Sequence, residues 1–159
     1  MEFMIQTNSP EETLKVGKKL GSCLHGGDVI ALYGGLGAGK TALAQGISQS
    51  LQISEPVISP TFTLIHEYKG VQNNIPVKLV HMDLYRLQHP EEGEVIGVED
   101  AFQPDAICLI EWPEICADLL PHDRLDIRIE GNGDLPRIFR ISGAEEWDER
   151  LKGLKEETV

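Results

Sequence analysis

The sequence is short of basic residues and of long apolar runs, and each shortage excludes a class of protein. Lysine and arginine together number 14 against 26 aspartates and glutamates, which gives a formal net charge of −12. Proteins that hold nucleic acid tightly by themselves usually carry a basic surface, so direct binding to DNA or RNA is disfavoured. No run of 18 apolar residues is present, so we expect no membrane span.

Cysteine is also scarce, and its pattern favours a reducing compartment. Cys23, Cys108 and Cys116 are odd in number and lack the spacing of a metal site. The first residues lack the basic region and long apolar core of a signal peptide. We therefore predict reduced thiols in a cytoplasmic protein. A chain of 159 residues is large enough for a core, and we expect a single domain over residues 1–159.

Glycine, in contrast, is concentrated in one stretch. Residues 34–41 read Gly-Gly-Leu-Gly-Ala-Gly-Lys-Thr and match the phosphate-loop pattern Gly-x4-Gly-Lys-Ser/Thr. Chance would place this pattern in about one chain of this size in a few hundred. The apolar run Val29 to Tyr33 comes directly before it, and Leu43, Ile47 and Leu51 follow at helical spacing. This strand, loop and helix are the context that the motif requires.

The residue types of this loop suit a triphosphate. Glycines let backbone N–H groups turn inward around phosphates, and the helix N-terminus that follows adds positive potential. We expect Lys40 to lie in an exposed loop and to reach the outer phosphates, and Thr41 to offer its hydroxyl to Mg²⁺. The alternative is a glycine-rich turn that binds nothing. The predicted nucleotide contacts are Gly34, Gly35, Leu36, Gly37, Ala38, Gly39, Lys40 and Thr41.

The rest of the chain mixes strand and helix patterns. A strand is expected over residues 2–7, and a helix follows Ser9, where Glu12 completes a capping box. A β-hairpin is expected over residues 62–82 with its turn at 69–74, then a buried strand at 106–110 and a second hairpin at 125–141. A closing helix is expected, with Trp147, Leu151 and Leu154 in one apolar stripe. The order indicates an α/β, three-layer P-loop NTPase-like fold, with a central mixed sheet, antiparallel hairpins and helices on both faces.

Two apolar strands end in an acid that could serve a nucleotide-bound metal. Residues 79–83 end at Asp83, and residues 107–111 end at Glu111. Carboxyl ends of strands line the ligand crevice of open α/β sheets, and phosphoryl chemistry needs a carboxylate for Mg²⁺ and a group that orients the nucleophile. Either acid could instead cap a helix or face solvent. His81 shares a strand face with Asp83. The pair could be catalytic, but a histidine satisfied by its strand surroundings is the simpler interpretation.

Four stretches, in this order, make the sequence resemble a known family. Besides the phosphate loop they are Ser-Pro-Thr-Phe at 59–62, His-Met-Asp-Leu-Tyr-Arg-Leu at 81–87 and Ile-Glu-Trp-Pro-Glu at 110–114. Together they resemble the bacterial TsaE family, also called YjeE, which is the small ATPase of tRNA threonylcarbamoyladenosine synthesis. The resemblance runs from the first helix to the strand near Leu125.

The resemblance implies an ATPase that uses ATP and Mg²⁺ and works with the TsaB and TsaD proteins. That assembly attaches a threonylcarbamoyl group to adenosine 37 of tRNAs that read codons beginning with A. The ATPase is thought to reset the assembly between turnovers, so tRNA would be reached only indirectly, through the complex. By position, Lys40 binds phosphate, Thr41 and Glu111 serve Mg²⁺, and Asp83 is a further carboxylate needed for hydrolysis.

Three more positions follow from the same resemblance. Thr61 resembles a switch-type contact near the γ-phosphate, and Trp112 would lie beside the nucleotide. Family members usually carry an acidic residue where Gly35 stands here. This chain therefore lacks any side-chain contact from that position, although glycine suits a backbone cradle.

A small P-loop kinase that phosphorylates a metabolite or nucleoside is the competing interpretation. Asp83 and Arg86 would then contact an acceptor hydroxyl. Against it, residues 84–102 are acidic and hold a single arginine, so no arginine-rich lid is evident. A nucleotide-gated interaction module without turnover is a third possibility. Since no arginine finger is evident either, we expect slow hydrolysis by the isolated chain.

Overall fold

One mixed sheet forms the centre of the molecule. The structure is a computed structural model, and it describes residues 1–35, 39–57 and 64–156. In these ranges seven strands pair in the order β1-β7-β6-β2-β5-β4-β3. Strand β2 is parallel to β5 and β6, and β4 is parallel to β5, whereas the outer pairs are antiparallel. The strands are β1 (Glu2–Thr7), β2 (Val29–Tyr33), β3 (Ile65–Gln72), β4 (Ile75–Asp83), β5 (Ala106–Glu111), β6 (Leu125–Glu130) and β7 (Arg137–Ser142).

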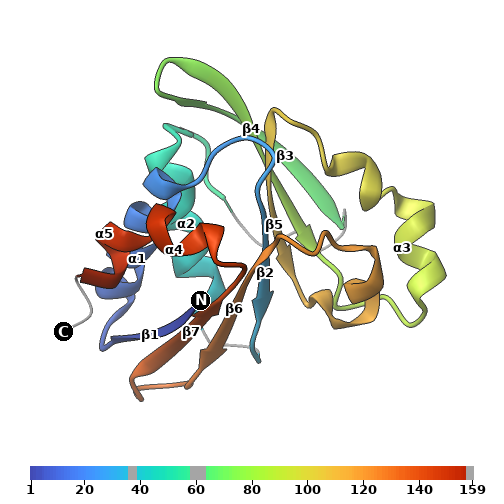
Figure 1. Cartoon of the computed structure of the whole chain (residues 1–159). Helices are drawn as coiled ribbons and strands as arrows, with labels where there is room; N and C mark the ends of the chain where they lie inside the picture. The colour runs from blue at the N-terminus through green and yellow to red at the C-terminus, as the bar shows by residue number, and fades with distance from the viewer. Residues whose placement is uncertain (36–38, 58–63, 157–159) are drawn as a thin grey trace.

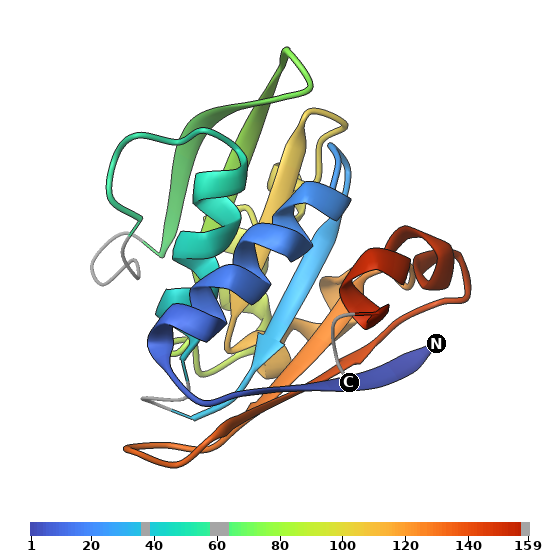
Figure 2. The same cartoon turned by 90° about the vertical axis from the view of Figure 1, so that its left-hand side faces the viewer.

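Helices cover both faces of this sheet, as the sequence predicts (Figures 1 and 2). One face carries α1 (Pro10–Cys23), α2 (Lys40–Ser50), α4 (Glu146–Arg150) and α5 (Lys152–Glu156). The other face carries α3 (Pro90–Ile96) and the 3₁₀ helices η1 (Glu99–Ala101) and η2 (Pro113–Leu119). The three-layer α/β arrangement is therefore confirmed.

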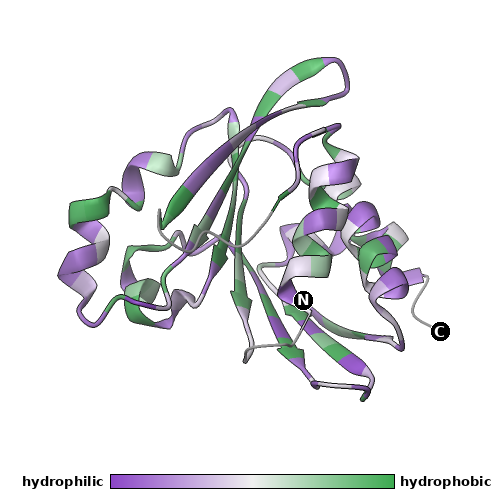
Figure 3. Ribbon diagram, turned by 180° about the vertical axis from the view of Figure 1, so that it is seen from behind, coloured by the Kyte–Doolittle hydropathy of each residue, from purple (hydrophilic) through white to green (hydrophobic). Residues whose placement is uncertain are grey.

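The central strands are apolar throughout because both of their faces are covered. In β2, Ile30 and Leu32 join the core beneath α1 and α2, whereas Val29, Ala31 and Tyr33 join the core beneath η2. Hydrophobic residues accordingly concentrate along the middle of the sheet (Figure 3). Strand β5 alternates in the same way. The apolar run before the phosphate loop is thus a strand that supports two cores.

Helix α1 holds α2 at very short range. A Cβ added at Gly46 of α2 would lie 2.3 Å from the backbone oxygen of Leu14, and one added at Gly17 of α1 would lie 2.4 Å from that of Leu43. Only glycine allows this approach. The start of α1 is capped as predicted, because Ser9 Oγ accepts the N–H of Glu12 at 3.1 Å. This close packing fixes where α2 points its N-terminus.

Two details differ from the sequence predictions. The first hairpin turns only at Asn73 and Asn74, whose φ angles of 52° and 64° make a tight two-residue turn. The predicted turn over 69–74 is too long, because β3 continues to Gln72 and packs against the end of α2. The closing helix is split in two, α4 and α5, although its apolar stripe is buried as expected.

The three cysteines and the described helices bear on the predictions of reduced thiols and of no membrane span. Cys23, Cys108 and Cys116 are free thiols. Cys108 is fully buried in the core, and burial raises the pKa of this thiol to about 12. Within the described ranges, no helix has the length and apolar character needed to cross a bilayer.

Candidate functional site

The candidate site lies where β2, β5 and β4 end side by side, next to the start of α2. Gly34 and Gly35 follow β2, and Gly39 is the N-cap of α2 with a φ of 102°. That left-handed conformation is one that glycine adopts without strain. Residues 36–38 (Leu36, Gly37 and Ala38) lie outside the described part of the chain, so their predicted contacts stay predictions.

Lys40 is the first residue of α2 and is only 6% exposed. Its Nζ donates a hydrogen bond to the Gly34 carbonyl at 2.9 Å and lies 4.0 Å from the centre of the Trp112 ring. The expectation of an exposed loop position is therefore wrong, because the side chain folds back across the loop onto Trp112. Burial lowers the pKa of Lys40, and Glu111, Asp83 and Glu114 act in the opposite direction.

Glu111 is the last residue of β5 and is 2% exposed. Its Oε1 lies 3.9 Å from Lys40 Nζ, and its Oε2 lies 2.5 Å from His81 Nε2. A carboxylate is seldom buried this deeply without partners. Here the lysine and the histidine occupy opposite ends of the carboxyl group, so Glu111 is held in one place between α2 and β4.

Asp83 is brought next to Glu111 by the strand register, in which the two residues pair directly across β4 and β5. Its side chain is partly buried, and its Oδ1 accepts the N–H of Tyr85 at 3.0 Å. Burial raises the pKa of Asp83, and the nearby Glu111 adds to this effect. Both acids predicted from the sequence therefore meet at one edge of the sheet, beside Lys40.

Trp112 contacts this cluster and also lines a hollow on the protein surface. Its backbone is left-handed, with a φ of 56°, which is uncommon for a bulky residue and costs free energy. Its ring contacts both Lys40 and Tyr85, and the two aromatic centroids are 4.9 Å apart. The adjacent hollow of about 290 Å³ is lined by Leu84, Tyr85, Leu87, Trp112, Glu114 and Ile115.

Two further predicted residues are Thr41, which the structure describes, and Thr61, which it does not. Thr41 is exposed in the first turn of α2, next to Lys40. Thr61 lies outside the described residues, so its switch-type role stays a prediction.

The described residues hold no group of three or more histidines, cysteines or acids that could bind a metal ion. Mg²⁺ at nucleotide sites needs only one or two carboxylates besides phosphate oxygens and water, which Asp83 and Glu111 could supply.

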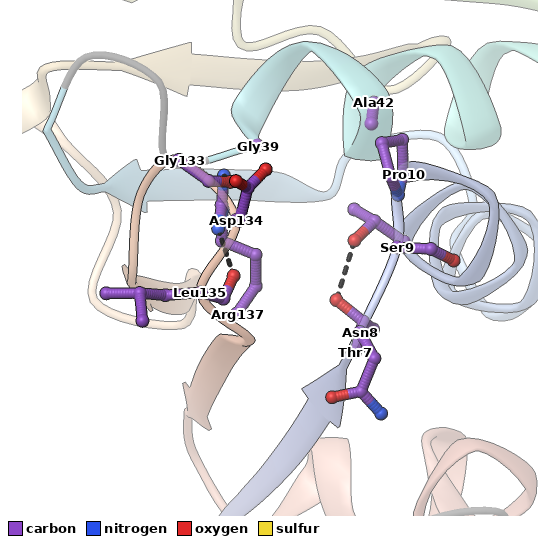
Figure 4. Close-up of a pocket in the computed structure, with 11 residues that line it drawn as sticks. Thr7, Asn8, Ser9, Pro10, Gly39, Ala42, Gly133, Asp134, Leu135 and Arg137 are labelled. Atoms are coloured by element: carbon purple, nitrogen blue, oxygen red, sulfur yellow. Dashed lines mark hydrogen bonds between the residues drawn. The ribbon is translucent and has the colours of Figure 1, made fainter.

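A pocket that the sequence did not reveal flanks the start of α2 (Figure 4). It has a volume of about 290 Å³ and lies between the β1–α1 turn, α2 and the β6–β7 hairpin. Arg137 on the hairpin donates to the carbonyls of Leu135 and Gly133, and its stem approaches Gly39. The lining of this pocket comes from three segments far apart in the chain, so no local motif could identify the pocket. The lining residues are Thr7, Asn8, Ser9, Pro10, Thr13, Gly39, Ala42, Gly133, Asp134, Leu135 and Arg137.

Comparisons with known proteins agree with this geometry. The family model "Threonylcarbamoyl adenosine biosynthesis protein TsaE" matches residues 7–139. The tRNA threonylcarbamoyladenosine biosynthesis protein TsaE of Bacillus subtilis is 40% identical over 129 residues, which covers 81% of this chain and 78% of the relative. The protein of the same name from Haemophilus influenzae is 42% identical over 135 residues, which covers 81% and 82%.

A solved structure also matches this chain. The crystal structure of Bacillus subtilis YdiB matches 98% of this chain and 95% of its own, with a TM-score of 0.79 and 31% sequence identity. The family match covers the phosphate loop, both acids and Trp112, and the structural match covers nearly the whole fold. The chain therefore belongs to the TsaE family of proteins, which take part in the biosynthesis of tRNA threonylcarbamoyladenosine.

Proposed function

We propose that this chain is a Mg²⁺-dependent ATPase that acts with TsaB and TsaD and resets their complex by hydrolysing ATP. The observation that carries the proposal is the pairing of Lys40 with Glu111. A buried lysine at the first position of α2 lies 3.9 Å from a buried carboxylate that ends the neighbouring parallel strand. A lysine and an acid in these positions are the elements that phosphoryl transfer requires.

The phosphates would bind at the N-terminus of α2, where unpaired N–H groups and the helix dipole favour anions. Lys40 would exchange its bond to the Gly34 carbonyl for bonds to phosphate oxygens. The base and ribose would enter the pocket beside Gly39 and Ala42, which offers both apolar and polar lining. The planar Arg137 guanidinium, already held by hairpin carbonyls, suits stacking on a base.

Mg²⁺ would be held by the hydroxyl of Thr41 and the carboxylate of Glu111, both hard oxygen ligands of the kind this ion prefers. When bound, the ion neutralises charge that develops on the transferred phosphoryl group. Asp83, in register with Glu111, would accept a hydrogen bond from the attacking water and orient it. The Trp112 ring would exclude bulk water from one side of Lys40.

The partners follow from charge and from the family. A chain with a net charge of −12 neutralises few phosphates, so we expect contact with tRNA only through TsaB and TsaD, in the cytoplasm. Thr61 would contact the γ-phosphate and report the nucleotide state to that complex, as switch loops do.

Release of inorganic phosphate from ATP tests the proposal directly. The isolated chain should release phosphate slowly with Mg²⁺ and not in EDTA, and water should be the sole acceptor. A small molecule that becomes phosphorylated in proportion to ADP would establish a kinase instead. A pull-down with TsaB and TsaD should differ between an ATP analogue and ADP, and Thr61→Val should weaken that difference. Equal capture in both states, together with tight binding to free tRNA, would contradict the proposed coupling.

A further inference from the structure

The innermost part of the site is a histidine that faces the buried acid. His81 is 1% exposed and lies on β4, two residues before Asp83. Its Nε2 is 2.5 Å from Glu111 Oε2. Strand β4 is paired on both sides, with β3 and with β5, so the backbone that carries His81 is fixed.

The charge state of Glu111 sets the direction of this hydrogen bond. The proposed role at Mg²⁺ requires an ionised carboxylate, which only accepts hydrogen bonds, so in that state the hydrogen lies on His81 Nε2. The other ring nitrogen, Nδ1, is buried, and among the described residues it has no hydrogen-bond partner. Within the described part of the chain, the hydrogen bond of the ring is therefore the one to Glu111.

This contact determines how Glu111 presents its oxygens. Because Oε2 is held by the histidine, Oε1 is the oxygen that faces Lys40 at 3.9 Å. Without the histidine, the acid would be free to rotate toward Lys40, and one buried oxygen would lose its partner. Groups that orient a metal-binding or catalytic carboxylate in this way commonly affect function about 10–100-fold when they are removed.

We infer that His81 is a positioning residue, which holds Glu111 in the orientation needed for the Mg²⁺–nucleotide complex. The inference rests on the proposed ATPase function, because it assigns Glu111 to that complex. His81 itself touches neither nucleotide nor metal in this assignment; it acts through the carboxylate.

Two substitutions separate this role from simple core packing. His81→Gln places an amide N–H where Nε2 lies, so it can still donate to Glu111. His81→Leu fills a similar volume and donates nothing. We expect His81→Leu to lower kcat about 10–100-fold, with the affinity for an ATP analogue in EDTA unchanged. His81→Gln should retain most of the activity.

The decisive measurement is a double-mutant cycle with Glu111→Gln. The readouts are kcat and the factor by which Mg²⁺ raises the affinity for the ATP analogue, measured by calorimetric titration. If His81 acts through Glu111, His81→Leu lowers both in the parent and changes neither in the Glu111→Gln background. Independent losses that multiply in the double variant, or a His81→Leu protein that matches the parent, would overturn the inference.

The design also covers loss of folding and failure of the ATPase proposal. If His81→Leu does not fold, His81→Asn serves instead, since its amide is too short to reach Glu111 while His81→Gln reaches it. Equal behaviour of these two variants would overturn the inference. If the parent shows no hydrolysis, the ATPase proposal fails, and the Mg²⁺ effect on analogue affinity still decides whether His81 acts through Glu111.

Discussion

Replacing Asp83 by asparagine tests the site and its electrostatics together. The side chain is partly buried at the end of β4, directly across from Glu111. Its Oδ1 accepts the N–H of Tyr85 at 3.0 Å. Asparagine keeps the size of the side chain and this acceptor oxygen and removes only the charge. The turn that follows β4 should therefore be preserved.

The rate should fall while the fold and nucleotide binding persist. If Asp83 orients the attacking water, its loss should lower kcat about a hundredfold, which corresponds to about 2.7 kcal/mol of barrier at 1.36 kcal/mol per tenfold change. Affinity for an ATP analogue should change little, because the phosphates are bound by Lys40 and the α2 N-terminus in the proposed function.

The stability of Asp83→Asn, in contrast to its rate, should exceed that of the parent at neutral pH. The pH dependence of this difference has a defined sign. Burial raises the pKa of Asp83 above its ordinary value of 3.8, so the folded state binds the proton more tightly than the unfolded state. The favourable contribution of the protonated group is complete below pH 3.8 and is lost as the pH rises through the folded pKa. Above that pKa the ionised carboxylate lowers the stability of the parent, and Asp83→Asn removes this effect.

Thermal unfolding without nucleotide or Mg²⁺, followed by circular dichroism from pH 3.5 to pH 8, checks this reasoning. The Tm of Asp83→Asn should match that of the parent at the acidic end and modestly exceed it at pH 7. Asp83→Ala is the control, because it also loses the bond to Tyr85, worth about 1 kcal/mol. A parental hydrolysis rate would remove Asp83 from the site. A lower Tm at pH 7 would show that its charge stabilises the fold.

Three further substitutions test the loop and its support. Lys40→Met keeps the buried stem, so it should weaken ATP binding more than tenfold in calorimetric titration without lowering the Tm, since burial already disfavours the charge. Loss of folding would mean that the lysine is structural. Gly35→Glu introduces the acid that the family resemblance leads us to expect, at an exposed position where an added Cβ meets no described atom within 4 Å. Its Tm should correspond to a stability change within about 0.5 kcal/mol. Gly46→Ala should cost at least about 2 kcal/mol in urea unfolding, because its Cβ would meet α1 backbone at 2.3 Å. Gly153→Ala, whose added Cβ meets no described atom within 4 Å, is its control.

Local patterns were sufficient to predict the elements around the site. The run Val29 to Tyr33 predicted β2, because burial on both faces leaves a continuous apolar run, and the spacing after Lys40 predicted α2, because burial on one face leaves a helical period. The strand ends at Asp83 and Glu111 were recognisable for the same reason. Their meeting at one edge follows from parallel pairing, which the sequence could only suggest.

Long-range pairing and side-chain direction were out of reach. Nothing local indicates that β1 pairs with β7, with Glu2 opposite Ser142. The burial of Lys40 depends on Trp112, 72 positions away in the sequence, whose left-handed backbone brings its ring over the lysine. The bond from His81 to Glu111 similarly depends on the register between β4 and β5. Such features arise only when the sheet is assembled.

The charges at the site explain why nucleotide binding should depend on a cation. Glu111, Asp83 and Glu114 all act on the single Lys40, so the described part of the site carries more negative than positive charge. A triphosphate adds further negative charge at a position where burial weakens screening by solvent. The N-terminus of α2 offsets part of this repulsion. In the proposed function Mg²⁺ offsets the rest, so Glu111 would oppose ATP binding in EDTA and favour it with Mg²⁺. The same buried carboxylate would thereby make both affinity and turnover depend on the metal.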